Sequence, residues 1–292
     1  MAHSQTSSVK QACDLPILPT ILVELMSIPP DDADYFLKIE KLAERDPPLA
    51  LKIIQLSNTA KHISVKPIRS IKEAIIKMGS KEVFNLINLV ALTKVFVPTS
   101  NFEKELWRQS LISAELLKTT YEILLRSVIT SDMAYLVGLL HDIEITLNHK
   151  QYVKDFEHLS DLSWYLPKPY QKHRIAYLLR QHAFNGAKVC KHWHIPSPIP
   201  EIIYFHHHDV LPEKFKQFTP LLETIRRLQF CDLVTHAYCQ HDELNIQEIQ
   251  SLIDESKILS KWQSQYNNFK VLYDALPGAL NTAIQKYAML AI

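Results

Sequence analysis

Glycine is scarce in this sequence, with four residues among 292. Glycine supplies the positive φ angles of many hairpin turns, so the usual turn signals of an all-β fold are few. Hydrophobic residues make up 47% of the chain and charged residues 22%, which is ordinary for a globular protein that buries a large core. We therefore expect an all-α fold, a multi-helical bundle.

Long apolar runs are also absent. No segment reaches the roughly 18 uninterrupted apolar residues of a membrane span, and the first ten residues lack the apolar core of a secretory signal. The cysteines are too few and too scattered for a disulfide framework. They are Cys13, Cys190, Cys231 and Cys239. We expect a cytoplasmic protein with reduced thiols.

The chain has no excess of charge of either sign. Lys and Arg number 32 and Asp and Glu number 31, which leaves a formal charge of +1. No global field favours nucleic acid or an anionic membrane, and no DNA- or RNA-binding motif is recognisable. We expect neither partner.

Helix caps are present in the first hundred residues. Asp46 before Pro47 is typical of an N-cap followed by a first-turn proline. Ser70 and Glu73 form a capping box, and Gly79 ends the helix that follows. These signals predict short helices in this part of the chain.

The best candidate for a subdomain boundary is the break at Pro98 and Ser100, after a helix that begins at Ser80. Beyond it, the apolar pattern predicts long helices over 102–127, 131–147 and 221–239. The predicted parts are a flexible N-terminus at 1–14, an N-terminal helical subdomain at 15–100 and a second helical subdomain at 101–292.

A His-Asp doublet, His141 and Asp142, lies inside the predicted helix over 131–147. Glycine inside a helix costs about 1 kcal/mol, and the missing side chain of Gly138, one turn earlier, would leave room for an ion or a ligand. Imidazole and carboxylate are common ligands of Zn, Mn or Fe, and a bound ion can activate water for attack on phosphorus. The alternative is a hydrogen-bonded pair that only stabilises the core.

Further ligands would have to come from other helices, because adjacent helical residues diverge by about 100°. Asp232 is the best donor, since a carboxylate in an apolar stretch needs a partner or a metal. Pairing with His236, one turn later, or with a neighbouring Arg is the alternative. We interpret the triplet His206, His207 and His208 as a helix end whose cationic side chains meet the negative dipole, in preference to ligation.

Several motifs carry a family resemblance. They are LPILP at 15–19, RDP at 45–47, LSN at 56–58, the segment 71–79, GLLHDI at 138–143, HAFNGA at 182–187 and the segment 203–207. Together they resemble the HDOD family, a regulatory branch of the HD superfamily of metal-dependent phosphohydrolases. The resemblance implies an N-terminal helical subdomain packed on a degenerate HD-like subdomain, in a bacterial signalling protein.

The resemblance also implies a metal site with a defect. Similar HD phosphohydrolases bind metal through a first His, the His-Asp doublet and a distal Asp, which here are Gln109, His141 with Asp142, and Asp232. The neutral amide of Gln109 is a poor substitute for imidazole. Glu144 stands where the HDIG form has glycine, and we interpret it as a solvated charge. The GYP tripeptide of the cyclic-dinucleotide phosphodiesterases is absent.

Two functions follow. The first is a signal-transduction module without catalysis that binds a signalling protein in trans or a small ligand, because loss of one of four ligands weakens a metal site severely. The second is a metal-dependent phosphohydrolase, acting on phosphodiesters or nucleotides with Mn, Mg, Fe or Zn. In it, His182, His206 and His207 would be additional ligands or phosphate contacts. No residue is assigned as catalytic.

Overall fold

The structure, a computed structural model, describes residues 19–29, 32–58, 68–79, 83, 101–124, 129–147, 173–192, 195, 197–208, 211–212 and 219–288. Every regular element in these ranges is a helix, which confirms the all-α prediction. No helix of this described part is both long and apolar enough to cross a bilayer.

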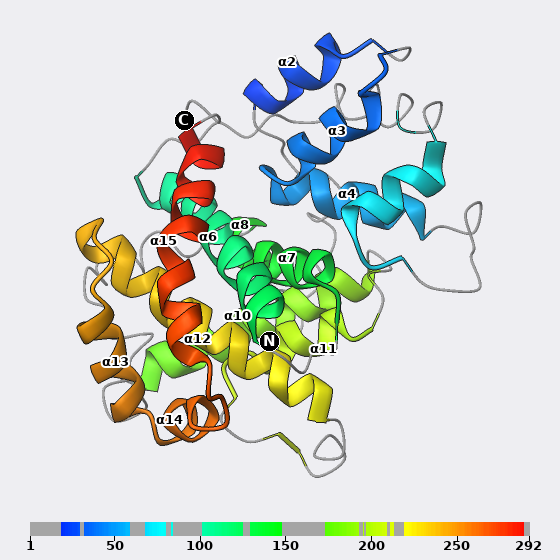
Figure 1. Ribbon diagram of the computed structural model, residues 1–292. Helices are drawn as coiled ribbons and strands as arrows, with labels where there is room; N and C mark the ends of the chain where they lie inside the picture. Colours follow the sequence, from blue (N-terminus) through cyan, green and yellow to red (C-terminus); the bar gives the residue numbers. More distant parts are fainter. Residues whose placement is uncertain are drawn as a thin grey trace.

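The helices are labelled in Figure 1 in chain order. They are α2 (Pro19–Ser27), α3 (Tyr35–Ala43), α4 (Pro47–Ser57), α6 (Asn101–Ile123), α7 (Ser131–Leu140), α8 (Ile143–Leu147), α10 (His173–His192), α11 (Ile199–Phe205), α12 (Thr219–His241), α13 (Ile246–Glu255), α14 (Lys257–Gln263) and α15 (Phe269–Ala288). Residues 71–79 are helical as well.

The long helix α6 is the centre of the bundle. It packs against α7, α12 and α15 and also contacts α8. Figure 1 shows α2, α3 and α4 together at one end of the molecule, with α13 and α14 at the far end. Trp107, Ile112 and Leu117 are fully buried and point in three different directions around α6, so this helix supplies core on several of its faces.

The predicted caps form as hydrogen bonds. The Leu49 N–H donates to Asp46 Oδ1 at 2.8 Å, and the Glu73 N–H donates to Ser70 Oγ at 3.2 Å. Gly79 has a φ of +74°, the left-handed conformation that ends a helix and that glycine adopts without strain. The structure therefore confirms the predicted caps at Asp46 and Ser70 and the predicted helix end at Gly79.

The single helix predicted over 131–147 is wrong. Helix α7 ends at Leu140, residues 141–142 form a turn, and α8 begins at Ile143. The amides of Ile145 and Thr146 donate to the Asp142 carbonyl, which starts the second helix. The apolar pattern runs through the turn because both short helices are buried, so the sequence does not mark the break.

The sequence suggested that the space beside Gly138 could hold an ion or a ligand, and this prediction is wrong. A Cβ there would lie 2.6 Å from both the Ala114 Cα and the Ser113 carbonyl oxygen. The α6 backbone therefore occupies the position that a side chain would fill. This close approach sets the distance between α6 and α7 one turn before the His-Asp doublet.

A buried arginine joins the C-terminal end of α6 to α12. Arg227 is fully buried, and its Nε donates to Glu223 Oε1 at 2.7 Å. Its guanidinium also donates to the Thr120 carbonyl at 2.7 Å and lies 4.3 Å from the centre of the Tyr121 ring. The charge is thus paired, and a helix-end carbonyl has a donor.

Some predictions fall outside the described residues. The flexible N-terminus at 1–14, Cys13, most of the helix from Ser80 and the boundary at Pro98 and Ser100 are among them. The two-subdomain division stays a prediction. The other three cysteines, Cys190, Cys231 and Cys239, are free thiols.

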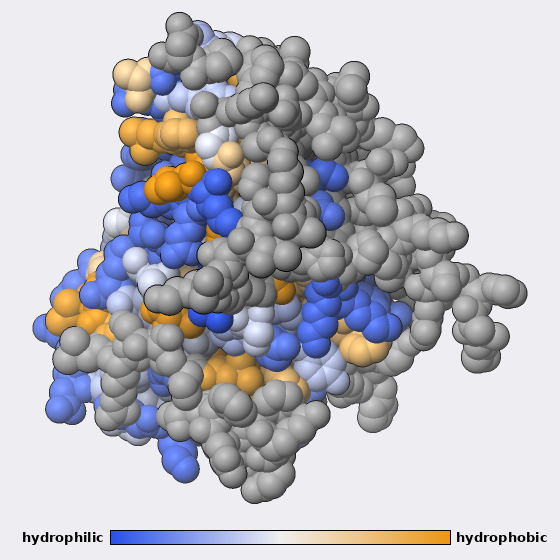
Figure 2. All heavy atoms as spheres, turned by 90° about the vertical axis from the view of Figure 1, so that its right-hand side faces the viewer, coloured by the Kyte–Doolittle hydropathy of each residue, from blue (hydrophilic) through white to orange (hydrophobic). Residues whose placement is uncertain are grey.

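The exposed large hydrophobic side chains are Phe36, Leu37, Ile76, Phe184 and Val271. On the face shown in Figure 2, hydrophobic residues of the described part occur in separate groups among hydrophilic ones. Scattered apolar side chains of this kind are normal on a globular protein.

We expect Gly138→Ala to lower the free energy of unfolding by about 3 kcal/mol, since the new Cβ overlaps the α6 backbone. Gly278→Ala in α15 is the matched control, because a Cβ there meets nothing within 4 Å. It should raise stability by about 0.5–1 kcal/mol. Urea unfolding followed by circular dichroism measures both, and equal effects would contradict the close packing of α6 on α7.

We expect Arg227→Met to cost about 3–5 kcal/mol of unfolding free energy, because it leaves Glu223 without its cation. Lys118→Met removes an exposed ion pair on α6, in which Lys118 Nζ lies 4.0 Å from Glu122 Oε1. That control should cost less than about 0.5 kcal/mol. The same urea titration measures both variants, and a small loss for Arg227→Met would show that the buried pair contributes little.

Candidate metal centre

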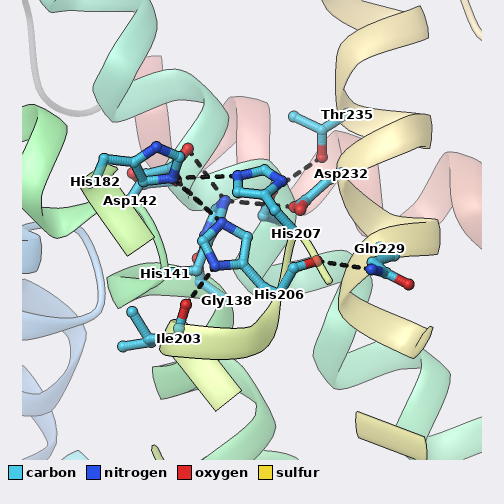
Figure 3. A network of polar contacts seen from close by, with 12 residues as sticks. Gly138, His141, Asp142, His182, Ile203, His206, His207, Gln229, Asp232 and Thr235 are labelled. Carbon is cyan, nitrogen blue, oxygen red and sulfur yellow. Dashed lines mark hydrogen bonds and ion pairs between the residues drawn. The ribbon is translucent and has the colours of Figure 1, made fainter. Parts of the chain in front are cut away.

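Six polar side chains converge from four separate parts of the chain (Figure 3). They are His141 and Asp142 from the turn between α7 and α8, His182 from α10, His206 and His207 just after α11, and Asp232 from α12. The sequence had named all six as candidate ligands, and the fold brings them into one cluster. The cluster contains two groups that share Asp142.

The first group places three imidazole nitrogens around one carboxylate oxygen. His182 Nε2 lies 3.1 Å and His206 Nε2 lies 3.7 Å from Asp142 Oδ1. His182 Nε2 is also 3.3 Å from His206 Nε2 and 3.2 Å from His207 Nε2. One ligand atom from each of these four residues lies within 4.8 Å of the others, so they form a possible metal-binding site. Tetrahedral ligands at the usual zinc distances are about 3.3 Å apart, close to these separations.

The second group is built around His141. Its Nε2 lies 3.3 Å from Asp142 Oδ2 and 3.3 Å from Asp232 Oδ1, while its Nδ1 is 2.7 Å from the Gly138 carbonyl oxygen. The two side chains of the doublet meet in the turn between α7 and α8, although adjacent helical positions diverge by about 100°. Asp142 therefore uses one oxygen for each group.

Burial and the two carboxylates set the charge of His141. Burial alone would lower the pKa of His141, but Asp142 and Asp232 outweigh it and raise this pKa to about 10. Burial raises the pKa of Asp232 to about 7. It also acts to raise the pKa of Asp142, but the surrounding histidines hold that pKa well below its usual value. At neutral pH, His141 is therefore an imidazolium beside the Asp142 carboxylate, while Asp232 is near its own pKa.

Two further histidines of the cluster, His206 and His207, are kept neutral. Burial lowers the pKa of His206 to about 4 and holds the pKa of His207 well below its usual value. Both residues do follow the C-terminal end of α11, as predicted, but the idea that they are cations at a helix dipole is wrong. Neutral imidazole is the form that binds a metal ion.

The residues present fit a bound cation. Asp142 Oδ1 and Asp232 Oδ1 are buried and accept no hydrogen bond of normal geometry within the described part of the chain. His206 Nδ1 lies 2.6 Å from the Ile203 carbonyl oxygen, which fixes the tautomer and turns the Nε2 lone pair toward Asp142. Buried carboxylate oxygens beside imidazole lone pairs are costly unless a positive charge lies between them.

Gln109 and Glu144, the two positions that depart from the family pattern, are not part of the six-residue cluster. The amide nitrogen of Gln109 is 3.5 Å from Glu105 Oε1, one turn away on α6, and no described contact joins it to the cluster. Glu144 was interpreted as a solvated charge, and this is wrong, because its side chain is buried and accepts a hydrogen bond from Asn185 at 3.3 Å. Its position on α8, which packs against α10, explains the burial.

The residues that hold the turn at 206–208, here called the histidine turn, were not predicted from the sequence. Gln229 and Arg226, on the α12 turns before Asp232, donate hydrogen bonds to backbone carbonyls at 206 and 208. A polar residue three positions before a buried aspartate on one helix face was the only signal available.

The comparisons with known proteins agree with this fold. A protein of Treponema pallidum (strain Nichols), named only as an uncharacterized protein, is 26% identical over 219 residues, which are 73% of this chain and 41% of that protein. The chain thus spans about two-fifths of the length of this relative.

Two crystal structures have a similar fold at low identity. The MmoQ response regulator of Methylococcus capsulatus str. Bath is 15% identical, with a TM-score of 0.62 over 85% of this chain and 95% of that one. A virulence factor of Campylobacter jejuni subsp. jejuni is 16% identical, with a TM-score of 0.62 over 95% and 96%.

The HDOD domain matches residues 15–209, which are more than half of the sequence. This match includes the His-Asp doublet and the histidines at 182, 206 and 207, and it confirms the resemblance found from the motifs. The chain belongs to the HDOD domain family.

Proposed function

We propose that this protein is a regulatory module of bacterial signal transduction that binds one transition-metal ion and acts by binding another protein or a small ligand, without catalysis. The observation that carries the proposal is the group of three imidazole nitrogens around Asp142 Oδ1. Asp142, His182 and His206 are nearly or fully buried, and each comes from a different segment. A bound ion would hold these segments together through its charge.

The donor set favours zinc or iron over magnesium. Three imidazole nitrogens and one carboxylate oxygen suit a borderline ion in tetrahedral geometry, whereas magnesium prefers six oxygen ligands. Among Mn, Mg, Fe and Zn, zinc fits this site best.

The number of protein ligands supports binding without catalysis. Structural zinc sites have four protein ligands, while catalytic sites keep a position open for water or substrate. Asp142 and the three histidines would complete a four-ligand shell, so no water need bind the ion. The ion would then stabilise one arrangement of α10, α11 and the doublet turn, to which a partner in trans responds. We propose a cytoplasmic location for this role.

A metal-dependent phosphohydrolase is the second candidate function. The group of His141, Asp142 Oδ2 and Asp232 Oδ1 lies on the other side of the shared carboxylate, and a second ion there would give a two-metal arrangement. Against this candidate stands Gln109, which replaces the first imidazole expected for that half of the site.

We expect the protein, purified without a His-tag and loaded with zinc, to retain about one zinc per chain after dialysis, by analogy with other four-ligand sites. Asp142→Asn and His206→Ala should each retain far less, because each removes one ligand. His241→Ala, which changes an exposed histidine at the end of α12, is the control and should retain as much as the wild type. Elemental analysis measures the content, and a wild-type protein without retained metal would contradict the proposal.

We expect no hydrolysis above the metal-only background when phosphodiesters, nucleotides and cyclic dinucleotides are incubated with the protein and Mn, Mg, Fe or Zn. The closed ligand shell leaves no position for an activated water. Turnover that disappears in Asp142→Ala but persists in His241→Ala would establish the phosphohydrolase instead.

A further inference from the structure

We propose that Gln229 is a positioning residue for the metal site, holding the backbone turn that carries His206 and His207. This inference rests on the proposed metal binding and names a residue that touches no ligand atom of the site. It concerns hydrogen bonds from α12 to the turn after α11.

Gln229 bonds to the turn on both sides of His207. Its Nε2 donates to the His206 carbonyl oxygen at 2.8 Å and to the His208 carbonyl oxygen at 3.2 Å. Figure 3 shows the Gln229 side chain extending from α12 to His206. One amide group therefore fixes two backbone carbonyls, one on each side of the candidate ligand His207.

Arg226 orients this amide. Its NH1 donates to Gln229 Oε1 at 2.6 Å and to the His208 carbonyl oxygen at 3.2 Å. With Oε1 facing the guanidinium, the Nε2 of Gln229 must face the turn. The assignment of oxygen and nitrogen in the amide is thus determined by its partners.

The turn needs these donors because the helix has ended. Carbonyls at and beyond a helix C-terminus lack helical N–H partners, and α11 ends at Phe205. The direction of the His206 ring depends on its bond to the Ile203 carbonyl and on the backbone at 206. A shift of this backbone would move the Nε2 atom away from Asp142.

The hydrogen bonds of Gln229 also connect two parts of the cluster. Gln229 lies three residues before Asp232 on α12, so the helix that supplies this carboxylate also fixes the histidine turn. Outer contacts of this kind orient ligands, and their loss typically lowers metal affinity about 10- to 100-fold.

The test is Gln229→Glu, which keeps the shape of the side chain and the acceptor for Arg226 but replaces the N–H donors with an oxygen. We expect the zinc affinity, measured by competition with a chromophoric chelator, to fall at least about tenfold. We also expect the cobalt-substituted protein to lose intensity in its visible absorption bands, which report tetrahedral coordination.

Gln263→Glu is the matched control. Gln263 donates to Gln250 Oε1 at 2.9 Å and to the Tyr273 hydroxyl at 2.8 Å, in contacts between α14, α13 and α15. This variant loses comparable hydrogen bonds and should keep both the zinc affinity and the cobalt spectrum. A similar loss of affinity in both variants would reduce Gln229 to a general stabilising role and overturn the inference.

A double variant tests whether Gln229 acts through the turn. In the His206→Ala background, Gln229→Glu should lower zinc affinity less than it does in the wild type, because one of the two ligands on the turn that Gln229 holds is gone. An equal loss in both backgrounds would contradict the inference. If the wild type binds no zinc, the proposed function fails together with this inference. If the wild type binds zinc and Gln229→Glu binds it equally well, the inference alone fails.

Discussion

The arrangement of the whole site depends on the Asp142 carboxylate. Its Oδ2 faces His141 and its Oδ1 faces His182 and His206, so one buried side chain belongs to two groups of ligand atoms. A buried carboxylate is stable only when its charge is compensated. His141 compensates one oxygen, and the other lies beside His182 and the neutral His206. A cation on that second side, as we propose, would compensate the remaining charge.

The rest of the fold places this carboxylate. The close contact of Gly138 with α6 fixes the end of α7, and the doublet follows in the turn before α8, where it meets side chains from α10 and α12. Arg227 ties α12 to the end of α6, and Gln229 ties it to the histidine turn. Side chains that the sequence separates by up to 91 positions, from His141 to Asp232, are thereby held within contact distance. This arrangement is consistent with the proposed regulatory role, because an ion at Asp142 would hold three separate segments of the chain together.

Local signals in the sequence predicted much of the fold. Asp46, Ser70 and Gly79 act over three or four residues, so their hydrogen bonds and φ angles follow from the local sequence. The break at 141–142 was not predicted, because it depends on burial of both short helices against other elements. The filling of the space beside Gly138 by α6 and the burial of Glu144 depend on the same long-range packing.

Sequence motifs identified the residues of the candidate site, but they did not predict how these residues divide into two groups. No pattern in the sequence indicates that Asp142 lies with His182, His206 and His207, while His141 lies between Asp142 and Asp232. The sequence suggested cationic histidines after α11, where burial keeps them neutral. Charge states of this kind are set by the depth of burial, which only the packed structure defines.

We propose that Asp142 and the three histidines bind one ion. X-ray absorption spectroscopy of the zinc-loaded protein tests it most directly, since the extended fine structure reports the atoms around zinc. Binding at this site predicts four nitrogen or oxygen ligands at about 2.0 Å from the zinc ion, together with outer-shell scattering from three imidazole rings. A six-coordinate shell dominated by oxygen, or scattering from one imidazole at most, would contradict it.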